Sequence, residues 1–285
     1  MSTVNLGNLT LILGSYACDR TCPHCIAKNN QKFNTKDDQI EKIAPILARL
    51  QEENVKFEKF VISGNGEPSL YSLDDIKKIA EAVKKHEDMF KEIEVQTSGN
   101  LFFENEKLEL LKKTFADKLA VNISKFSVSN WGWDKTTTKM LEDYENPRDY
   151  MATDAFKNTP NINLDIVMHN YLDYGNLRTN VITLREKFPN ISNVRLKHAV
   201  NCSGQDKSKQ SEWVKKNKFT GYGVFMGLDD HDKEKRNSGK YDYADIFEID
   251  TSNPSCDYFG DLVISKGTLM DYNEKPVTTI DENLK

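Results

Sequence analysis

Apolar residues recur along the chain with two alternating periods. Short apolar runs, such as residues 9–14 (LTLILG) and 60–62 (FVI), are typical of buried strands. Between these runs the apolar positions recur every three or four residues, as they do on the buried face of a helix. In residues 37–52 this spacing joins Ile40, Ile43, Ala44, Leu47 and Leu50. The chain is therefore predicted to alternate between strand and helix.

The alternation predicts a parallel sheet whose neighbouring strands are joined by helices. Predicted strands cover residues 9–14, 60–62, 93–97, 119–128, 163–168 and 194–200. Predicted helices cover residues 37–52, 73–90, 106–115, 174–188 and 211–218. Because parallel strands need right-handed crossovers, six such units indicate an α/β fold, a partial (β/α)6 TIM-like barrel. Functional residues of such barrels lie at the C-terminal ends of the strands.

Three segments depart from this alternation. Residues 131–160 are less regular and are expected to form a lid or a substrate-contacting excursion, and residues 218–243 are polar and predicted to form a long loop. Residues 246–272 indicate two short strands, a C-terminal β-hairpin extension that turns at Lys266 and Gly267. We therefore predict a barrel core over residues 1–200 and an extension over residues 201–285 that closes the barrel.

Composition narrows the class of protein. With 285 residues, of which 38% are hydrophobic, the chain is long enough to bury a real core. Its net charge of -5 disfavours a nucleic-acid partner, because such proteins usually carry a basic surplus. No apolar run approaches the roughly 18 residues that span a membrane, and the first residues lack a signal-peptide pattern. We therefore expect a cytoplasmic protein without a membrane partner.

A cluster of cysteines follows the first predicted strand. Cys18, Cys22 and Cys25 have the spacing C-x3-C-x2-C, whereas Cys202 and Cys256 lie far away. Three thiolates on a short loop can hold three irons of a cubane cluster and leave the fourth iron open to a ligand. The alternatives are a zinc site, although His24 between two of the cysteines could hardly complete one tetrahedron with all three, and a coincidental grouping. We expect Cys202 and Cys256 to be ordinary thiols, with ligation of a second cluster as the alternative.

The loop resembles the C-x3-C-x-Φ-C signature of the radical S-adenosylmethionine (SAM) superfamily, where Φ is usually aromatic and is His24 here. The resemblance implies a [4Fe-4S] cluster on Cys18, Cys22 and Cys25, with SAM on the open iron. It also implies that the ring of His24 packs near the SAM adenine.

Other segments resemble SAM-binding motifs of the same superfamily. Residues 63–68 (SGNGEP) resemble the GGE motif that binds the SAM amino group, which implies that role for Gly66 and Glu67. Residues 96–100 (QTSGN) resemble a segment that touches the methionyl part of SAM, which implies that role for Ser98. Similar enzymes use a serine on the fourth strand for the SAM carboxylate or ribose, and Ser124 is the candidate here. For each segment, an ordinary turn or strand end is the alternative.

The fifth and sixth predicted strands carry polar residues at alternate positions. Asp165 and His169 share one face of the fifth strand and are expected to line the cavity. Arg195 on the sixth strand would bind a carboxylate or phosphate of SAM or substrate if it faces inward. If it faces outward, it is a solvated charge.

The resemblance implies a radical mechanism. An external donor of the flavodoxin or ferredoxin type reduces the cluster, and SAM is cleaved to methionine and a 5′-deoxyadenosyl radical that abstracts hydrogen from the substrate. A nucleotide or small metabolite is the expected substrate. The alternatives are radical modification of a peptide or protein and, in another class, a zinc-binding interaction protein.

Overall fold

The computed structural model describes residues 3–13, 18, 38–64, 66–125, 150–168, 177–198, 240–243, 247–250, 262–265, 268–271 and 276–278. The chain divides into two compact units. Unit 1 comprises Met1–Asp19, Asn30–Val121 and Tyr258–Lys285, and unit 2 comprises Arg20–Asn29 and Asn122–Asp257. The predicted boundary between a core over residues 1–200 and an extension over residues 201–285 stays a prediction.

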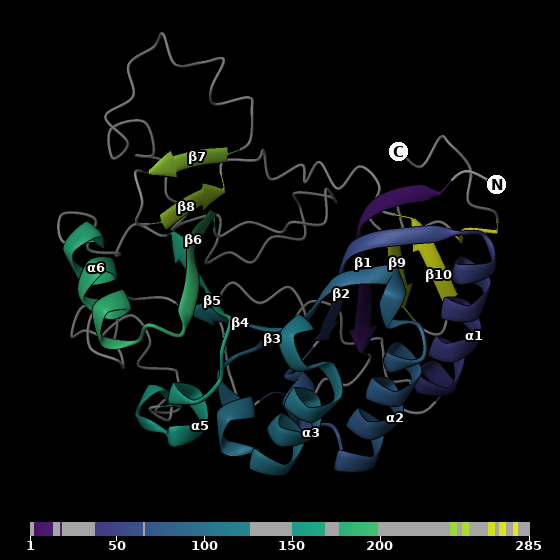
Figure 1. Ribbon diagram of the computed structural model, residues 1–285, viewed down its shortest axis with the longest axis horizontal. Helices are drawn as coiled ribbons and strands as arrows, with labels where there is room; N and C mark the ends of the chain where they lie inside the picture. The colour runs from purple at the N-terminus through teal and green to yellow at the C-terminus, as the bar shows by residue number, and fades with distance from the viewer. Residues whose placement is uncertain are drawn as a thin grey trace, which may run out of the picture. The chain divides into compact units, whose positions relative to one another are not determined.

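Unit 1 is a sheet with its helices on one side. Its strands lie in the order β10-β9-β1-β2-β3-β4. Their bounds are β1 (Val4–Leu13), β2 (Val55–Gly64), β3 (Phe90–Thr97), β4 (Leu119–Lys125, which continues into unit 2), β9 (Leu262–Ser265) and β10 (Thr268–Asp271). The helices α1 (Asp38–Glu52), α2 (Leu73–Lys84) and α3 (Asn105–Phe115) lie in a row beside β1, β2 and β3 (Figure 1). β1 pairs with β2 and β2 with β3, in parallel, so α1 and α2 are the predicted crossovers.

Side chains alternate between the two faces of β2 and β3. Phe60 and Ile62 on β2 and Ile93 on β3 are buried and apolar. The alternate positions of β2 include Lys59 and Ser63, with the buried Val61 between them. Since successive side chains of a strand point to opposite faces, one face of this sheet is apolar and the other carries polar groups.

The predicted helix over residues 73–90 was too long. α2 begins after Ser72, whose hydroxyl accepts the N–H of Asp75, and it ends at Lys84. A 3-10 turn over Glu87–Met89 follows, and β3 already begins at Phe90. The ring of Phe90 stacks on Phe57 with centroids 5.8 Å apart, so packing against the neighbouring strand outweighs the helical periodicity of this segment.

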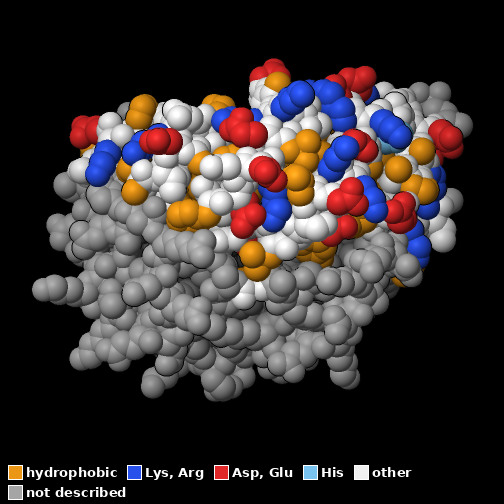
Figure 2. All heavy atoms as spheres, turned by 90° about the horizontal axis from the view of Figure 1, so that it is seen from below, with side chains coloured by type: hydrophobic (Ala, Val, Ile, Leu, Met, Phe, Trp, Pro, Cys, Tyr) orange, Lys and Arg blue, Asp and Glu red, His pale blue; other side chains and the backbone are white. Residues whose placement is uncertain are grey.

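The outer surface of the helices is a solvated mixture of charges. On the face drawn in Figure 2, Lys and Arg side chains are interspersed with Asp and Glu. Lys78 of α2, for example, lies 3.4 Å from Asp74 and 3.5 Å from Glu41 of α1. Such exposed pairs contribute little to stability.

Unit 2 is built around the parallel pair of β5 (Ile162–Met168) and β6 (Ile191–His198). β8 (Phe247–Asp250) pairs with β6 in parallel, and β7 (Lys240–Tyr243) pairs with β8 in the antiparallel sense. The helices of this unit are α5 (Asp154–Lys157) and α6 (Leu177–Lys187). The prediction of a loop over residues 218–243 was therefore wrong at its end, because residues 240–243 (KYDY) form a strand that pairs with β8. The predicted helix at residues 211–218 lies outside the described residues.

The predicted C-terminal hairpin is confirmed. β9 and β10 pair in the antiparallel sense on either side of residues 266–267, and β9 also pairs in parallel with β1. Leu262, Ile264 and Leu269 are buried, and Arg49 of α1 donates to the carbonyl of Val277 at 3.2 Å. The hairpin thus extends the sheet of unit 1 beside the strand that leads to the cysteines.

Removal of residues 262–285 is expected to destabilise unit 1 strongly. Each of the three buried side chains contributes about 1.5–3 kcal/mol, and the edge of β1 would lose its partner strand. The measurement is the urea midpoint of unfolding followed by circular dichroism. Removal of residues 279–285, beyond the described part of the hairpin, is the control and should leave the midpoint near that of the full chain. Equal midpoints for both truncations would contradict the packing described here.

Candidate functional site

The loops after β2 and β3 are joined by one buried carboxylate. Glu67, which follows β2, is only 2% exposed. Its Oε1 accepts hydrogen bonds from Thr97 Oγ1 at 2.7 Å and from the N–H of Ser69 at 3.1 Å. Its Oε2 accepts from the N–H of Ser98 at 2.6 Å. The structure therefore brings together Glu67 and Ser98, two residues that the sequence singled out separately.

The turn after β3 is held in one conformation by Thr97. Its hydroxyl donates to Glu67 and accepts the N–H of Gly99 at 3.1 Å. Gly99 has φ of 100°, in the left-handed region that a residue without Cβ adopts at little cost. Asn100 then donates to Ser69 Oγ at 3.2 Å, which is a further link to the loop after β2. The two loops thus form a fixed rim at the C-terminal ends of β2 and β3.

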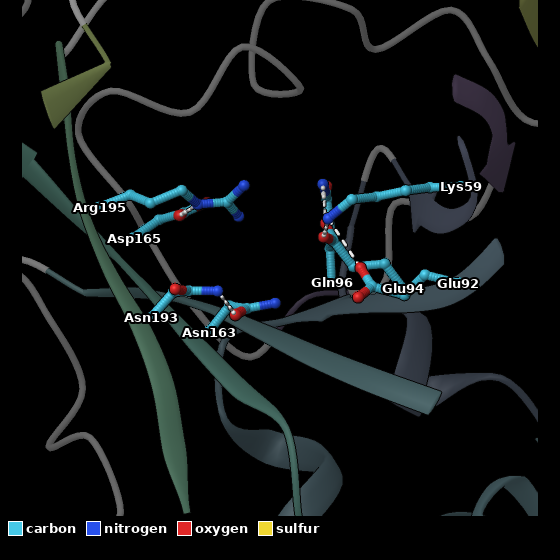
Figure 3. Close-up of polar contacts among 8 residues, drawn as sticks. All are labelled: Lys59, Glu92, Glu94, Gln96, Asn163, Asp165, Asn193 and Arg195. Atoms are coloured by element: carbon cyan, nitrogen blue, oxygen red, sulfur yellow. Dashed lines mark hydrogen bonds and ion pairs between the residues drawn. The ribbon is translucent and has the colours of Figure 1, made fainter. Parts of the chain in front are cut away.

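A chain of polar side chains runs along the polar face of β2 and β3 (Figure 3). Lys59 Nζ lies 2.7 Å from Glu92 Oε1 and 3.1 Å from Glu94 Oε2. Gln96 Nε2 donates to Glu94 Oε1 at 3.1 Å, and Ser63 Oγ donates to Gln96 Oε1 at 2.8 Å. The chain leads from the middle of the strands to Ser63, next to the end of β2.

The charge of Lys59 is maintained by its neighbours. Burial by itself lowers the pKa of Lys59, but the carboxylates of Glu94 and Glu92 outweigh burial and raise that pKa above its ordinary value. Lys59 is therefore an ammonium at neutral pH, and Glu94, whose side chain is 4% exposed, has a cation beside it.

In unit 2, two polar pairs connect β5 and β6 (Figure 3). Arg195 Nε donates to Asp165 Oδ1 at 2.6 Å, and Asn193 Nδ2 donates to Asn163 Oδ1 at 3.0 Å. Asp165 is buried and lies directly opposite Arg195 in the parallel register. Arg195 therefore lies in an ion pair, and its guanidinium is oriented by the neighbouring strand.

The remaining predicted site residues are only partly described. Cys18 is exposed, and Ser124 lies on β4. Gly66 lies in the loop after β2, beside Glu67. Outside the described residues lie Cys22, His24, Cys25, His169, Cys202 and Cys256.

The polar chain on β2 and β3 was not predicted from the sequence. The signal was present as alternation, because Glu92, Glu94 and Gln96 occupy every second position of one strand. The sequence did not indicate that Lys59 would lie opposite Glu92, which depends on the strand register. Likewise, the sequence singles out Asp165 and Arg195 one at a time. Only the pairing of β5 with β6 brings them opposite each other as an ion pair.

The fold and this rim define an α/β protein whose candidate site lies at the C-terminal ends of parallel strands. Residues 12–142 match the family model of the radical SAM superfamily. The match confirms the resemblance to this superfamily that the sequence led us to expect. A search of curated proteins found no match. Among the described residues, no helix is long and apolar enough to cross a membrane.

Three solved structures are similar to this chain at low sequence identity. Histidine-tagged anSMEcpe with bound AdoMet is 18% identical, with a TM-score of 0.50 over 71% of this chain and 53% of that chain. HydG, a maturase of the [FeFe]-hydrogenase, is 12% identical, with a TM-score of 0.46 over 67% and 43% of the two chains. Coproporphyrinogen III oxidase (HemN) from Escherichia coli, a radical SAM enzyme, is 11% identical, with a TM-score of 0.44 over 84% and 54%. The chain thus spans about half the length of anSMEcpe. Its structural similarity to anSMEcpe confirms the expected fold class, an α/β partial TIM-like barrel.

Glu67→Ala is expected to lower the free energy of unfolding by about 3 kcal/mol or more, because three donors around a buried position lose a charged acceptor. Glu67→Gln should lower the free energy of unfolding by less, since the amide keeps one oxygen that can accept hydrogen bonds. The measurement is urea unfolding followed by circular dichroism. The control is Glu52→Ala on the exposed end of α1, which should change stability by no more than about 0.5 kcal/mol. Equal effects of Glu67→Ala and Glu52→Ala would refute the bridging role.

Lys59→Met is expected to destabilise the protein by about 3–5 kcal/mol, because it removes the cation beside a buried carboxylate. The double variant Lys59→Met/Glu94→Gln should recover part of the loss. Because the pKa of Lys59 is raised in the folded state, its contribution is fully present below the unfolded pKa and is lost as the pH rises through the folded value. The stability difference between wild type and Lys59→Met, measured by urea unfolding, should therefore shrink at strongly alkaline pH. A difference independent of pH would contradict this assignment.

Proposed function

We propose that this protein reductively cleaves SAM on a [4Fe-4S] cluster and uses the resulting radical to abstract hydrogen from a small molecule. The observation that carries the proposal is the rim at the ends of β2 and β3, where Glu67 ties together the two loops that resemble SAM-binding motifs. The match of residues 12–142 to the radical SAM family model supports the same chemistry.

Each predicted site residue has a role in this proposal. Cys18, Cys22 and Cys25 would hold the cluster, which fits the preference of iron–sulfur clusters for thiolates and the position of Cys18 just beyond β1. His24 would pack near the adenine, and Gly66 and Glu67 would lie at the SAM amino group. Ser98 would contact the methionyl part of SAM.

Ser124 and Arg195 would bind oxygen atoms of the ligand. Ser124 is assigned to the SAM carboxylate or ribose. Arg195 is assigned to a carboxylate or phosphate of SAM or substrate, because Asp165 orients its guanidinium.

When bound, the reduced cluster supplies the electron that breaks a carbon–sulfur bond of SAM. The protein holds the ligand on a rim that is already ordered and must keep water away from the reacting atoms. We assign closure of the site to residues 201–285.

The expected substrate is a nucleotide or small metabolite, and the expected electron donor is an external protein of the flavodoxin or ferredoxin type. We propose a cytoplasmic location, with no membrane partner and no nucleic-acid partner. Radical modification of a peptide or protein, and a zinc-binding interaction protein, are the competing functions that the experiment below addresses.

Anaerobic reconstitution with iron and sulfide is expected to give a brown protein with a broad absorption band at roughly 400 nm. Addition of SAM and dithionite should then yield 5′-deoxyadenosine, measured by liquid chromatography. Cys22→Ala should abolish both the stable cluster and the product, because one thiolate ligand is lost, whereas the control Cys256→Ala should retain both. A colourless protein that binds zinc would refute the proposal, and continued product from Cys22→Ala would refute the site assignment. Turnover of an added peptide, with none of nucleotides or small metabolites, would favour the competing radical function.

A further inference from the structure

Ser69, two residues after Glu67, is bound through its N–H, its hydroxyl and its carbonyl. Its N–H donates to Glu67 Oε1 at 3.1 Å, and its hydroxyl oxygen accepts from Asn100 Nδ2 at 3.2 Å. Its carbonyl oxygen accepts from Lys107 Nζ of α3 at 2.7 Å. Because Ser69 is only 2% exposed, water has little access to replace these partners. The loop after β2 is therefore attached to α3 as well as to the loop after β3.

The side chain of Lys107 is directed to this loop. Lys107 is the third residue of α3, its side chain is 14% exposed, and its Nζ also lies 2.9 Å from Glu104 Oε2. Fixing a lysine side chain costs conformational entropy, and an ion pair between neighbouring turns returns little of it. Lys112 makes the same kind of pair with Glu109, at 2.8 Å, within α3 alone. What distinguishes Lys107 is the hydrogen bond to Ser69, 38 positions earlier in the chain.

The hydrogen bond from Lys107 continues through one peptide group to the backbone of Glu67. The carbonyl of the Ser69–Leu70 peptide accepts from Lys107, and the N–H of the same peptide donates to the carbonyl oxygen of Glu67 at 3.0 Å. A cation at the carbonyl end polarises the peptide and strengthens the hydrogen bond at its other end. The ammonium group thus holds the 3-10 turn η2 (Pro68–Leu70) closed from a helix outside the loop.

We propose that Lys107 is a positioning residue, which fixes Glu67 and the turn after it in the conformation that binds SAM. The inference rests on the proposed function, which puts SAM at Glu67, and it adds a residue of α3 that does not itself contact the ligand. Loss of the ammonium group opens the turn locally, because the bond holds a loop and not a packed face of the sheet. A loop that occupies its binding conformation for only a fraction of the time lowers the apparent affinity by that fraction.

The first test is amide hydrogen exchange of the reconstituted protein without SAM, followed by mass spectrometry of peptides that cover residues 68–72. In Lys107→Met the Leu70 amide should exchange about tenfold faster or more, because the turn has lost a hydrogen bond from a charged group. Methionine retains an apolar stem against the protein, so the packing of α3 is kept. Lys107→Arg keeps a charged donor and should exchange as wild type does. Lys112→Met, on the same helix, is the matched control and should also leave the exchange of Leu70 unchanged.

The second test is the affinity for SAM, measured by anaerobic isothermal titration calorimetry on the same reconstituted proteins. Lys107→Met should bind SAM about tenfold more weakly with the cluster absorbance unchanged, whereas Lys107→Arg and Lys112→Met should bind as wild type does. Glu104→Gln removes the partner next to the helix but leaves the hydrogen bond to Ser69. It should therefore retain both the slow exchange and the affinity of wild type.

Unchanged exchange in Lys107→Met would show that the turn is held without this lysine and would overturn the inference, as would faster exchange with unchanged SAM affinity. An equal loss in Glu104→Gln or Lys112→Met would assign the effect to the charge of α3 in general and overturn it as well. In each of these cases wild type still binds SAM, so only this inference fails. If the reconstituted wild type binds no SAM, the proposed function fails, and this inference fails with it whatever the exchange rates show.

Discussion

The candidate site depends on a carboxylate that the protein has taken out of water. Transfer of a charged group to the interior is costly unless donors surround it, and Glu67 is surrounded by the hydroxyl of Thr97 and the N–H groups of Ser69 and Ser98. Because these donors come from both loops, neither loop can move away without leaving a buried charge poorly solvated. The rim at the ends of β2 and β3 is therefore held together by hydrogen bonds within the protein, which is a condition for effective electrostatic stabilisation of a ligand.

The same sheet shows how a parallel α/β fold accommodates charge on one face. Phe60 and Ile62 bury the opposite face of β2, so Lys59 and Ser63 on the other face carry polar groups without loss of that core. Lys59 lies opposite Glu92 in the register and reaches Glu94 diagonally, and this placement puts a cation beside the buried carboxylate of Glu94. A polar face of this kind suits a barrel interior that receives a ligand, and it would be an expensive way to build a core alone.

In unit 2, too, polar side chains on neighbouring strands pair with one another. Asp165 and Arg195 face each other across parallel strands, as do Asn163 and Asn193, so each side chain is held by its partner on the next strand. The C-terminal hairpin adds a further constraint in unit 1, because β9 covers the edge of β1, the strand from which the cysteine segment departs.

The periodicity of apolar residues determined the α/β class, the parallel alternation and the terminal hairpin, because burial of one face imposes a local pattern that the sequence records. The cysteine spacing and the glycine-containing segment at residues 63–68 likewise pointed to the superfamily. Only the tertiary structure decided that β3 begins at Phe90, which packs on Phe57, and that residues 240–243 form a strand. It also decided that Glu67 reaches Thr97 and that Lys59 lies between two carboxylates. These contacts join residues about 30 positions apart in the chain, and they depend on strand register and loop geometry, which no local pattern encodes.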